Sequence, residues 1–348
     1  MNKLKFEKFE MKYGYFLPDD FKSFMNKFGG GCYFGSCSFE HLTNMISNTV
    51  RIYGKMDFHL FPFGFVGNGD YYCFYKYGEN REDYFVGIWL HETNNFVILC
   101  KTFKAFIYRC VLDDYFSTIV TESEVCAEDA KILEKESLER CYILSKEYKF
   151  DFEKIKKIES QNDYHKLMVE YDPFALQSLC YLGKSYLENN NEIGIEYLNQ
   201  AKKICSYYMA PYYILSNYYL INDKTKMKSE LLEGIQTSLS LTGYSYWEED
   251  YIDIPENAHE NIATFLKNEN IYIDPNIYDY NFRLKIAKEF KDRKMYKEAL
   301  REYANALYCS EDYYINKDIL EKSLKCCIEG GINYLSKIIQ YDIKFLKL

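Results

Sequence analysis

The first segment with a clear hydrophobic pattern lies near the amino terminus. Apolar residues recur there at spacings of three and four, at Leu17, Phe21, Phe24 and Phe28. Pro18 is tolerated in the first turn of a helix, and the two aspartates after it suit the positive end of the helix dipole. The spacing therefore predicts an amphipathic helix. Gly29, Gly30 and Gly31 should end it, in a left-handed cap and a tight turn into a strand.

Short apolar and aromatic runs follow, after a second predicted helix from about Phe39 to Ile52. The runs, of a length and composition typical of strands, are Tyr71–Tyr75, Phe85–Leu90 and Phe96–Cys100. Polar turn residues at 77–80 and 91–95 separate them and predict hairpins. Thr102 can cap a closing helix whose apolar side is Phe103, Phe106, Ile107 and Cys110. We expect an α+β domain with an antiparallel sheet over residues 1–118.

From Ser123 onward the strand signals fade and the helical period dominates. The Lys and Glu residues along 122–149 are typical of a solvated helix face, and we expect residues 119–165 to form a helical connector. Residues 166–348 then hold successive helical hairpins. The second predicted unit is therefore all-α.

An ordered set of motifs in the first part resembles the SUKH superfamily. It comprises Leu17-Pro18-Asp19-Asp20-Phe21, Phe28-Gly29-Gly30-Gly31, Phe61-Pro62-Phe63-Gly64, Gly67-Asn68-Gly69-Asp70-Tyr71-Tyr72-Cys73-Phe74 and Trp89-Leu90-His91-Glu92. That family includes the yeast cell-wall synthesis regulator and many bacterial immunity proteins. The similarity covers about residues 5–115. It implies an α+β fold and a non-enzymatic role in which the domain binds a toxin, often a nuclease, and keeps its active site from substrate.

The glycine-rich part of these motifs also has a physical interpretation. Gly64, Gly67 and Gly69 allow positive φ values, which Asn68 tolerates, so the chain can turn sharply before the strand at Tyr71. Asp70 lies where the loop meets the strand, and its carboxylate can accept backbone N–H groups there. A direct partner contact is the alternative role for Asp70.

The second part resembles tetratricopeptide repeats. The clearest copy has the spacing of that repeat at Ile286-Ala287, Phe290, Ala299, Tyr303 and Ala306, with a turn at Asp292-Arg293-Lys294. An earlier copy reads Leu182-Gly183, Tyr186, Gly194, Leu198 and Ala201, and a third begins at Leu215-Ser216 and Tyr219. Small residues would let paired helices approach closely, with aromatic residues beside them. The stretch from Tyr244 to Ile277 would hold a distorted copy.

A run of tyrosines in these repeats has two interpretations. Tyr207, Tyr208, Tyr212, Tyr213, Tyr218 and Tyr219 follow a helical spacing. Such a run is more often core between helices, but exposed tyrosines on a concave face would be good anchors for a peptide. The aromatic content of 18% also fits the codon bias of an AT-rich genome.

Charge and composition limit the function. The net charge is −9, yet residues 1–120 hold 13 basic and 13 acidic residues, so the remaining 30 basic and 39 acidic residues carry the whole excess. Neither part has the basic excess that nucleic-acid binding needs. No apolar run is long enough for a membrane helix, and the first ten residues lack the apolar core of a signal peptide, so we expect a cytoplasmic protein without membrane contact.

Motifs for catalysis or metal binding are missing from the sequence. The 12 cysteines include no Cys-x-x-Cys pair, and Cys32, Cys37, Cys326 and Cys327 have no nearby His, so buried free thiols are expected rather than a zinc site. His91-Glu92 lacks the second His of a zinc-protease motif, because position 95 is Asn95. His41 and His59 are expected at the surface or partly buried. We therefore predict no catalytic residue, no cofactor and no metal.

The sequence thus predicts a protein that binds other proteins. The first hypothesis is an immunity-type protein whose SUKH-like domain neutralises a nuclease-like toxin encoded nearby, with the repeats adding contacts. The candidate partner-binding residues are Asn68, Asp70, Glu79, Glu82, Asp83 and Trp89. Acidic groups among them would complement a basic nuclease cleft. The alternative is a cytosolic scaffold or adaptor whose repeats bind peptides.

Overall fold

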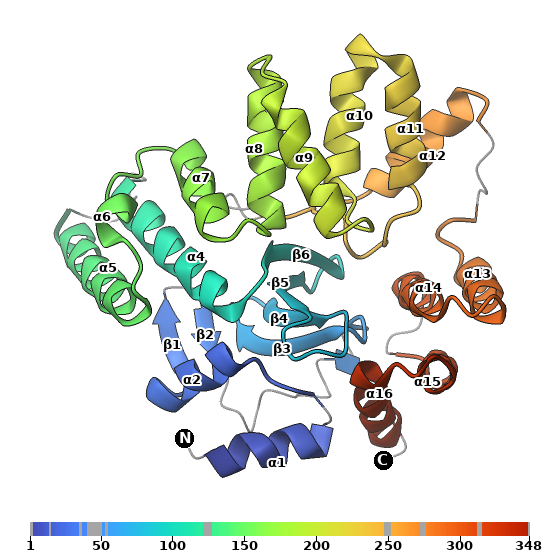
Figure 1. The fold of residues 1–348 in the computed structure, drawn as a ribbon, viewed down its shortest axis with the longest axis horizontal. Coiled ribbons are helices and arrows are strands. Elements are labelled where there is room, and N and C mark those ends of the chain that lie inside the picture. The colour runs from blue at the N-terminus through green and yellow to red at the C-terminus, as the bar shows by residue number, and fades with distance from the viewer. Residues whose placement is uncertain are drawn as a thin grey trace.

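A six-stranded antiparallel sheet lies at the centre of the molecule, with helices on both of its faces (Figure 1). The computed structural model describes residues 3–13, 15–34, 37–39, 51–52, 55–120, 127–246, 252–271, 276–311 and 315–346. The strands follow one another in chain order across the sheet, from β1 to β6. They are β1 (Gly31–Phe34), β2 (Cys37–Phe39), β3 (Leu60–Phe65), β4 (Tyr71–Lys76), β5 (Tyr84–Leu90) and β6 (Asn95–Cys100).

The predicted strands are confirmed, and each extends only one residue beyond its expected range. Both predicted hairpins are also present, because β4 pairs with β5 and β5 pairs with β6, each antiparallel. Phe39 lies in β2, and Arg51 and Ile52 are helical. The rest of the helix expected at Phe39–Ile52 lies outside the described residues.

One face of the sheet packs against α1 (Lys3–Tyr13), α2 (Asp19–Lys27) and α4 (Phe103–Tyr115). Helix α2 begins directly after Pro18 and ends before Gly29, which has a φ of 78°. Thr102 caps α4 as predicted, since its side chain accepts a hydrogen bond from the Ala105 N–H at 3.0 Å. The four residues expected on the apolar side of α4 are all buried. The predicted α+β architecture is therefore confirmed.

The opposite face of the sheet is covered by the second part of the chain. Sheet residues on this face share a hydrophobic core with residues of the helical region from Leu176 to Leu266, and they include Cys73, Tyr75, Phe85, Trp89, Phe96 and Ile98. Every residue of β5 and of β6 is buried. An antiparallel sheet often exposes one face and then alternates apolar and polar residues. Burial on both faces explains why these two strands lack this alternation, with Asn95 at the start of β6 as their polar exception.

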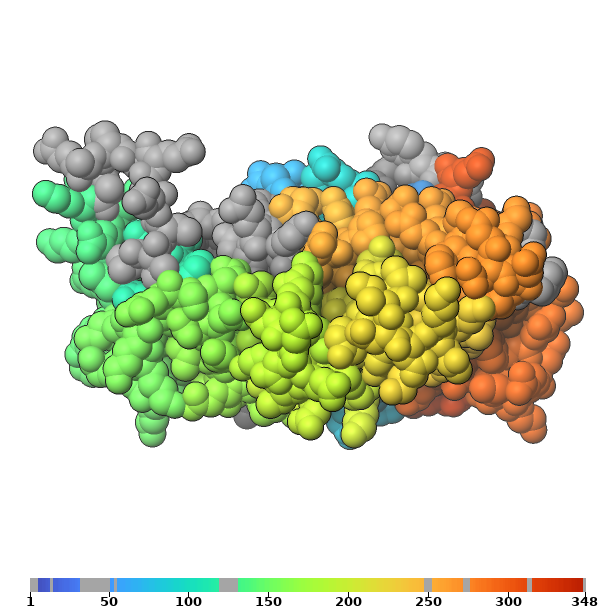
Figure 2. Space-filling view, turned by 90° about the horizontal axis from the view of Figure 1, so that it is seen from above, coloured from blue at the N-terminus to red at the C-terminus, as the bar shows by residue number. Residues whose placement is uncertain are grey.

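The helical region forms an arc over the sheet (Figure 1). After a short π-helical turn at Phe116–Val120, its helices are α5 (Ala127–Tyr148), α6 (Phe152–Ile155), α7 (Gln161–Tyr171), α8 (Leu176–Glu188), α9 (Ile193–Ile204), α10 (Ala210–Asn222), α11 (Lys224–Gly234), α12 (Ala258–Asn268), α13 (Tyr280–Asp292), α14 (Tyr296–Tyr308), α15 (Lys317–Gly330) and α16 (Asn333–Phe345). Seen from above, these helices form a nearly continuous surface, and little of the sheet shows between them (Figure 2). Consecutive helices pack in adjacent pairs, as in a solenoid.

The helix pairs match the repeat copies expected from the sequence. Helices α8 and α9, α10 and α11, and α13 and α14 are packed neighbours. Gly183 and Gly194 permit the close approach of α8 and α9, since a Cβ on Gly183 would lie 2.5 Å from Leu198 Cγ and one on Gly194 would lie 2.4 Å from the Gly183 oxygen. Ala287 and Ala299 are fully buried between α13 and α14. The predicted tetratricopeptide-like architecture is thus confirmed.

The expected distorted copy at Tyr244–Ile277 contains α12 in its described part. The segment before it, residues 235–246, runs back to the sheet. The Phe96 N–H of β6 donates to the Ser240 oxygen at 2.7 Å, and the Leu239 N–H donates to Asn305 Oδ1 of α14 at 3.0 Å. Strand β6 is at the edge of the sheet, where an uncovered row of backbone groups would favour aggregation. The segment therefore covers this edge and joins it to α14.

The expected connector packs against the first domain. Helix α5 exposes residues 131–136, in agreement with a solvated face, but its Cys141 and Leu144 belong to the same core as α4. Arg140 on α5 pairs with Asp114 on α4, with Nη2 2.9 Å from Oδ1. Within the described ranges, no helix is both long and apolar enough to cross a membrane.

Candidate functional site

The six predicted partner-binding residues lie at opposite ends of the sheet. Asn68 and Asp70 are in the loop between β3 and β4, and Trp89 pairs with Tyr71 at the start of β4. Glu79, Glu82 and Asp83 are in the loop after β4. A strand of six residues separates the two groups by about 20 Å at ~3.4 Å per residue. They do not form one contact surface.

Asp70 is fully buried and bonds within the molecule. Its Oδ1 accepts from the His91 N–H at 2.9 Å and lies 2.8 Å from His91 Nδ1, and its Oδ2 accepts from Asn68 Nδ2 at 3.0 Å and from the Tyr246 hydroxyl. Burial raises the pKa of Asp70, but the hydrogen bonds from Tyr246, His91 and Asn68 outweigh it and lower the pKa overall. Asp70 therefore has the structural role that the sequence suggested, as an acceptor of hydrogen bonds within the loop. Its carboxylate accepts from side chains as well as from a backbone N–H.

Two of the predicted contact residues have buried side chains. Asp70 is 0% exposed and Trp89 is 2% exposed, so neither side chain can touch a partner in this conformation. Asn68 is exposed. Gly67 and Gly69 have the expected positive φ values of 105° and 111°. The expectation for Gly64 is wrong, because it lies in β3 and pairs with Tyr72.

The loop between β4 and β5 is held by the basic side chains behind it. Lys101 Nζ donates to the backbone oxygens of Glu82 and Tyr84, each at 3.0 Å, and Lys76 Nζ donates to the oxygen of Asn80. Burial lowers the pKa of Lys76 to about 8.

The carboxylates of this loop also bond within the molecule. Asp83 Oδ2 accepts from the Asn80 N–H at 3.0 Å, so this carboxylate shapes the loop. Glu79 Oε1 accepts from the Asn333 N–H at 2.7 Å, at the start of α16.

Acidic and basic side chains both lie beside this loop, and Asp19 pairs with Lys22 and with Arg81, each at 2.8 Å. Glu82 and Asp19 are both exposed, Asp19 with 73% of its side chain accessible. Burial raises the pKa of Glu82, and the charges of Asp20 and Asp19 raise it further. The charges of Lys76 and Lys101 act in the opposite direction and lower this pKa. We name Asp19, Asp20 and Glu82 the acidic edge.

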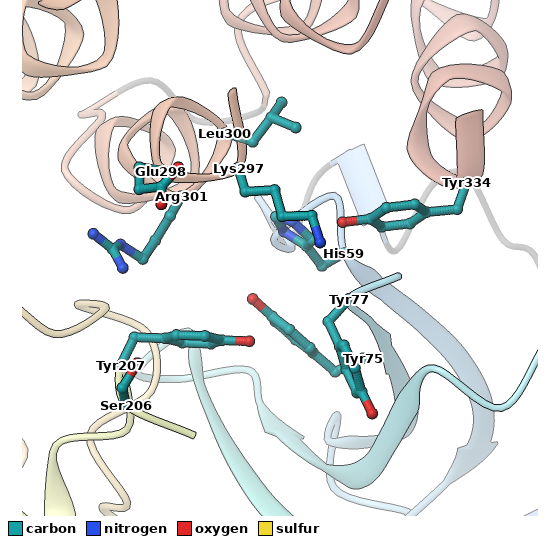
Figure 3. A pocket seen from close by; sticks show the side chains of 10 residues that line it. All are labelled: His59, Tyr75, Tyr77, Ser206, Tyr207, Lys297, Glu298, Leu300, Arg301 and Tyr334. Carbon is teal, nitrogen blue, oxygen red and sulfur yellow. The ribbon is translucent and has the colours of Figure 1, made fainter. Parts of the chain in front are cut away.

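A pocket lies between the sheet and the helical region (Figure 3). Its volume is about 220 Å³, and its walls are His59, Tyr75, Tyr77, Ser206, Tyr207, Lys297, Glu298, Leu300, Arg301 and Tyr334. They come from the segment before β3, from β4 and its end, from the α9–α10 loop, and from α14 and α16. We call it the central pocket.

The floor of the central pocket is buried and aromatic, and its rim is exposed. His59, Tyr75, Leu300 and Tyr334 are buried, whereas Ser206 and Lys297 are exposed. The rings of His59 and Tyr75 stack with their centroids 5.1 Å apart. His59 Nδ1 lies 2.7 Å from Asp57 Oδ1, which turns the other ring nitrogen away from that carboxylate. His59 is thus more buried than expected, at 7% exposure.

A second hollow runs beside α10 in the helical region. It has a volume of about 430 Å³ and includes Tyr213, Tyr218 and Ile221 in its wall. Ile221 is 89% exposed. The tyrosine run divides accordingly: Tyr208, Tyr212 and Tyr219 are buried in the core, while Tyr207, Tyr213 and Tyr218 line pockets.

The described residues contain no group of three or more His, Cys, Asp or Glu side chains that could hold a metal ion. The side chains of nine cysteines are described, all as free thiols, and all but Cys309 are buried. Their burial agrees with the interpretation as buried thiols. Cys32, Cys37 and Cys126 are not among them, and His41 also lies outside the described part.

Sequence reasoning missed the central pocket and found only one of its aromatic walls, Tyr207. Its residues are distributed from position 59 to position 334, and no local pattern joins them. The signal that was available is the lack of alternation in β5 and β6, which indicates that something covers the second sheet face.

Comparison with known proteins gives one match. Neither the curated proteins nor the solved structures include a match to this chain. Residues 2–109 match the family model described as SMI1 / KNR4 family (SUKH-1). That range contains the whole sheet, α1, α2 and the first half of α4. The amino-terminal part of this chain is therefore a SUKH-type domain, followed by a helical region of paired helices.

Proposed function

We propose that this chain is a non-enzymatic protein of the immunity type, which binds a nuclease-like toxin through its SUKH-type domain and neutralises it. The match of residues 2–109 to the SUKH-1 model carries the proposal, because bacterial members of the superfamily act in this way. The helical repeats add contacts to the partner. The protein acts in the cytoplasm, where free thiols such as those described here stay reduced.

The acidic edge is the surface that best fits such a partner. One sheet face is packed under α1, α2 and α4, and the other lies under the helical region, so neither face is open to a protein. Asp19 and Glu82 remain exposed beside a loop fixed by Lys76 and Lys101. The exposed carboxylates of Asp19 and Glu82 could exchange their basic neighbours within the chain, such as Arg81, for basic side chains of a partner's cleft.

The test is co-expression of the full chain with a toxin encoded by a neighbouring reading frame. Cells that carry both should survive, and Glu82→Lys should weaken the complex, measured by calorimetry, at least tenfold. Glu139→Lys, an exposed position on α5, makes the same change in net charge and should leave affinity unchanged. Continued killing by the toxin in the presence of the wild-type chain would refute the immunity function.

A scaffold that binds peptides through its repeats is the second candidate. The hollow beside α10 favours it, because Tyr213, Tyr218 and the exposed Ile221 offer an apolar and aromatic surface. If a partner is captured whose binding is lost on Tyr218→Ala and kept on Glu82→Lys, the scaffold function replaces the immunity function.

A further inference from the structure

The central pocket has no role in the proposed function. It is nevertheless built from segments far apart in the chain, namely β4 and its end, the α9–α10 loop, α14 and α16. We propose that the central pocket binds a small organic anion, a carboxylate or a phosphate ester, through Lys297 and the hydroxyls of Tyr75 and Tyr334.

The polar groups of the pocket converge. In Figure 3 the hydroxyls of Tyr75, Tyr207 and Tyr334 point toward its middle, and the side chain of Lys297 reaches toward the same place. These three tyrosines come from β4, the α9–α10 loop and α16, and they line the same pocket. Tyr77 points away, and its hydroxyl is bonded to Lys101.

These hydroxyls keep their protons and can donate. Burial raises the pKa of Tyr75 and of Tyr207 well above the ordinary value, and it raises that of Tyr334 too. Neither the Tyr75 nor the Tyr334 hydroxyl has a hydrogen-bond partner among the residues that the structure describes. The buried Nε of Arg301 also has none there. The two hydroxyls open to the pocket, where an anionic ligand would supply acceptors for them.

The wall of the pocket holds two basic side chains and one acidic side chain. Lys297 and Arg301 are the basic residues of its wall and Glu298 is the acidic one. Asp57 lies behind His59, and its carboxylate oxygen Oδ1 is 2.7 Å from His59 Nδ1. The guanidinium of Arg301 lies over the ring of Tyr207, 6.0 Å from its centroid, and it lowers the pKa of that phenol against the larger effect of burial. Arg301 Nε lies 3.8 Å from Glu302 Oε1, whereas Lys297 has no ion pair among the described residues, so Lys297 is the cation that would meet a negative ligand.

The size and shape of the pocket favour an organic ligand over a bare ion. A volume of 220 Å³ corresponds to about seven water molecules at ~30 Å³ each. That room is below the range of drug-sized sites, which begins at roughly 300 Å³. The stacked rings of His59 and Tyr75 offer an apolar floor for a ring or a short chain. The charged end of the ligand would stay near Lys297, at the exposed rim.

Calorimetry on the full chain tests the proposal, with phenyl phosphate and benzoate as probes. At least one probe should bind saturably with one site per chain. Phenol and inorganic phosphate should bind at least tenfold more weakly. Phenol lacks the anionic group of the ligand, and inorganic phosphate lacks its ring. Because the pocket joins β4 to α14 and α16, the bound probe should also raise the melting temperature.

Variants identify the site. Lys297→Met should weaken the better probe about tenfold, or about 1.4 kcal/mol, and Tyr334→Phe should weaken it about threefold. Lys288→Met, an exposed lysine on α13, should bind as the wild type does. The proposal is overturned if neither probe saturates, if phenol or inorganic phosphate binds as tightly as the better probe, or if Lys297→Met leaves its affinity unchanged.

Discussion

Arg51 and Asp342 form a buried ion pair between segments that lie 291 positions apart in the chain. Arg51 Nη2 lies 2.8 Å from Asp342 Oδ2, and each side chain is only 1% exposed. Arg51 also donates to the backbone oxygen of Leu60 at the start of β3. The last helix, α16, is thereby joined to the sheet, and its Ile338 shares a core with Phe6 and Phe9 of α1.

Arg51→Met should be strongly destabilising. The substitution leaves the Asp342 carboxylate buried without its partner, which typically costs about 3–5 kcal/mol. The double variant Arg51→Met/Asp342→Leu should recover much of that loss, because it removes both charges. Urea unfolding followed by circular dichroism measures both. Lys317→Met breaks an exposed pair with Glu321 and should cost under ~1 kcal/mol, and an equally small effect of Arg51→Met would contradict the importance of the buried pair.

Asp70→Asn should make the free energy of unfolding depend less on pH in the acid range. Hydrogen bonds hold the pKa of Asp70 below its ordinary value of 3.8 in the folded chain. The ionised carboxylate therefore adds stability above about pH 4, and this contribution is lost as pH falls through the lower folded value. The variant should unfold at lower urea concentration than the wild type at pH 7, and the gap should narrow below about pH 4. Glu139→Gln, an exposed carboxylate on α5, is the control and should show no such gap. A gap that stays constant down to pH 3 would show that the charge is unimportant.

Local patterns were sufficient to predict the elements. The strand at Tyr71 follows from a run of apolar residues after a glycine-rich loop, and Ala287 and Ala299 mark a helix pair because only small residues fit there. Such features depend on neighbours in the sequence, and so they can be identified without the fold. The opposite placement of Asn68 and Glu79 was also accessible, because successive loops of an antiparallel meander alternate between its ends.

Long-range packing was not accessible in the same way. Nothing near Tyr246 indicates that its hydroxyl bonds to Asp70, 176 positions earlier. The central pocket likewise depends on how Lys297 and Tyr334 are brought to Tyr75 by the path of the helical arc. Helical repeats specify contacts between neighbours, whereas their placement over a sheet depends on the fit of two surfaces that are distant in the chain.

The expected division after residue 118 leads to a prediction about fragments. A fragment of residues 1–118 would expose the sheet face that the helical region covers, including Phe85, Trp89 and Ile98. It should therefore aggregate or bind the dye ANS strongly, unlike the full chain. Phe85→Lys/Ile98→Lys in the fragment should reduce the dye binding, because both residues lie on that face. A monomeric fragment 1–118 without dye binding would show that the first domain does not need this cover.

His259 should make the folded chain sensitive to mild acid. Its ring is buried, with Nε2 3.0 Å from Thr237 Oγ1, and burial followed by the charge of Arg283 lowers its pKa to about 3. Between its ordinary value of 6.5 and about 3, the unfolded chain binds a proton that the folded chain does not, so stability falls as pH decreases through that window, by ~1.4 kcal/mol per unit for one proton. His259→Gln should reduce the slope between pH 6 and 5 in urea unfolding by the contribution of this one proton, whatever its effect at pH 7, and His165 should keep its own contribution. Thr237→Val is the control, since it removes the hydrogen bond but keeps the buried ring, and it should retain the slope. The assignment fails if His259→Gln loses stability with acid as steeply as the wild type, and then the proton uptake belongs to other groups, such as the equally buried His165, whose pKa is lowered well below the ordinary value.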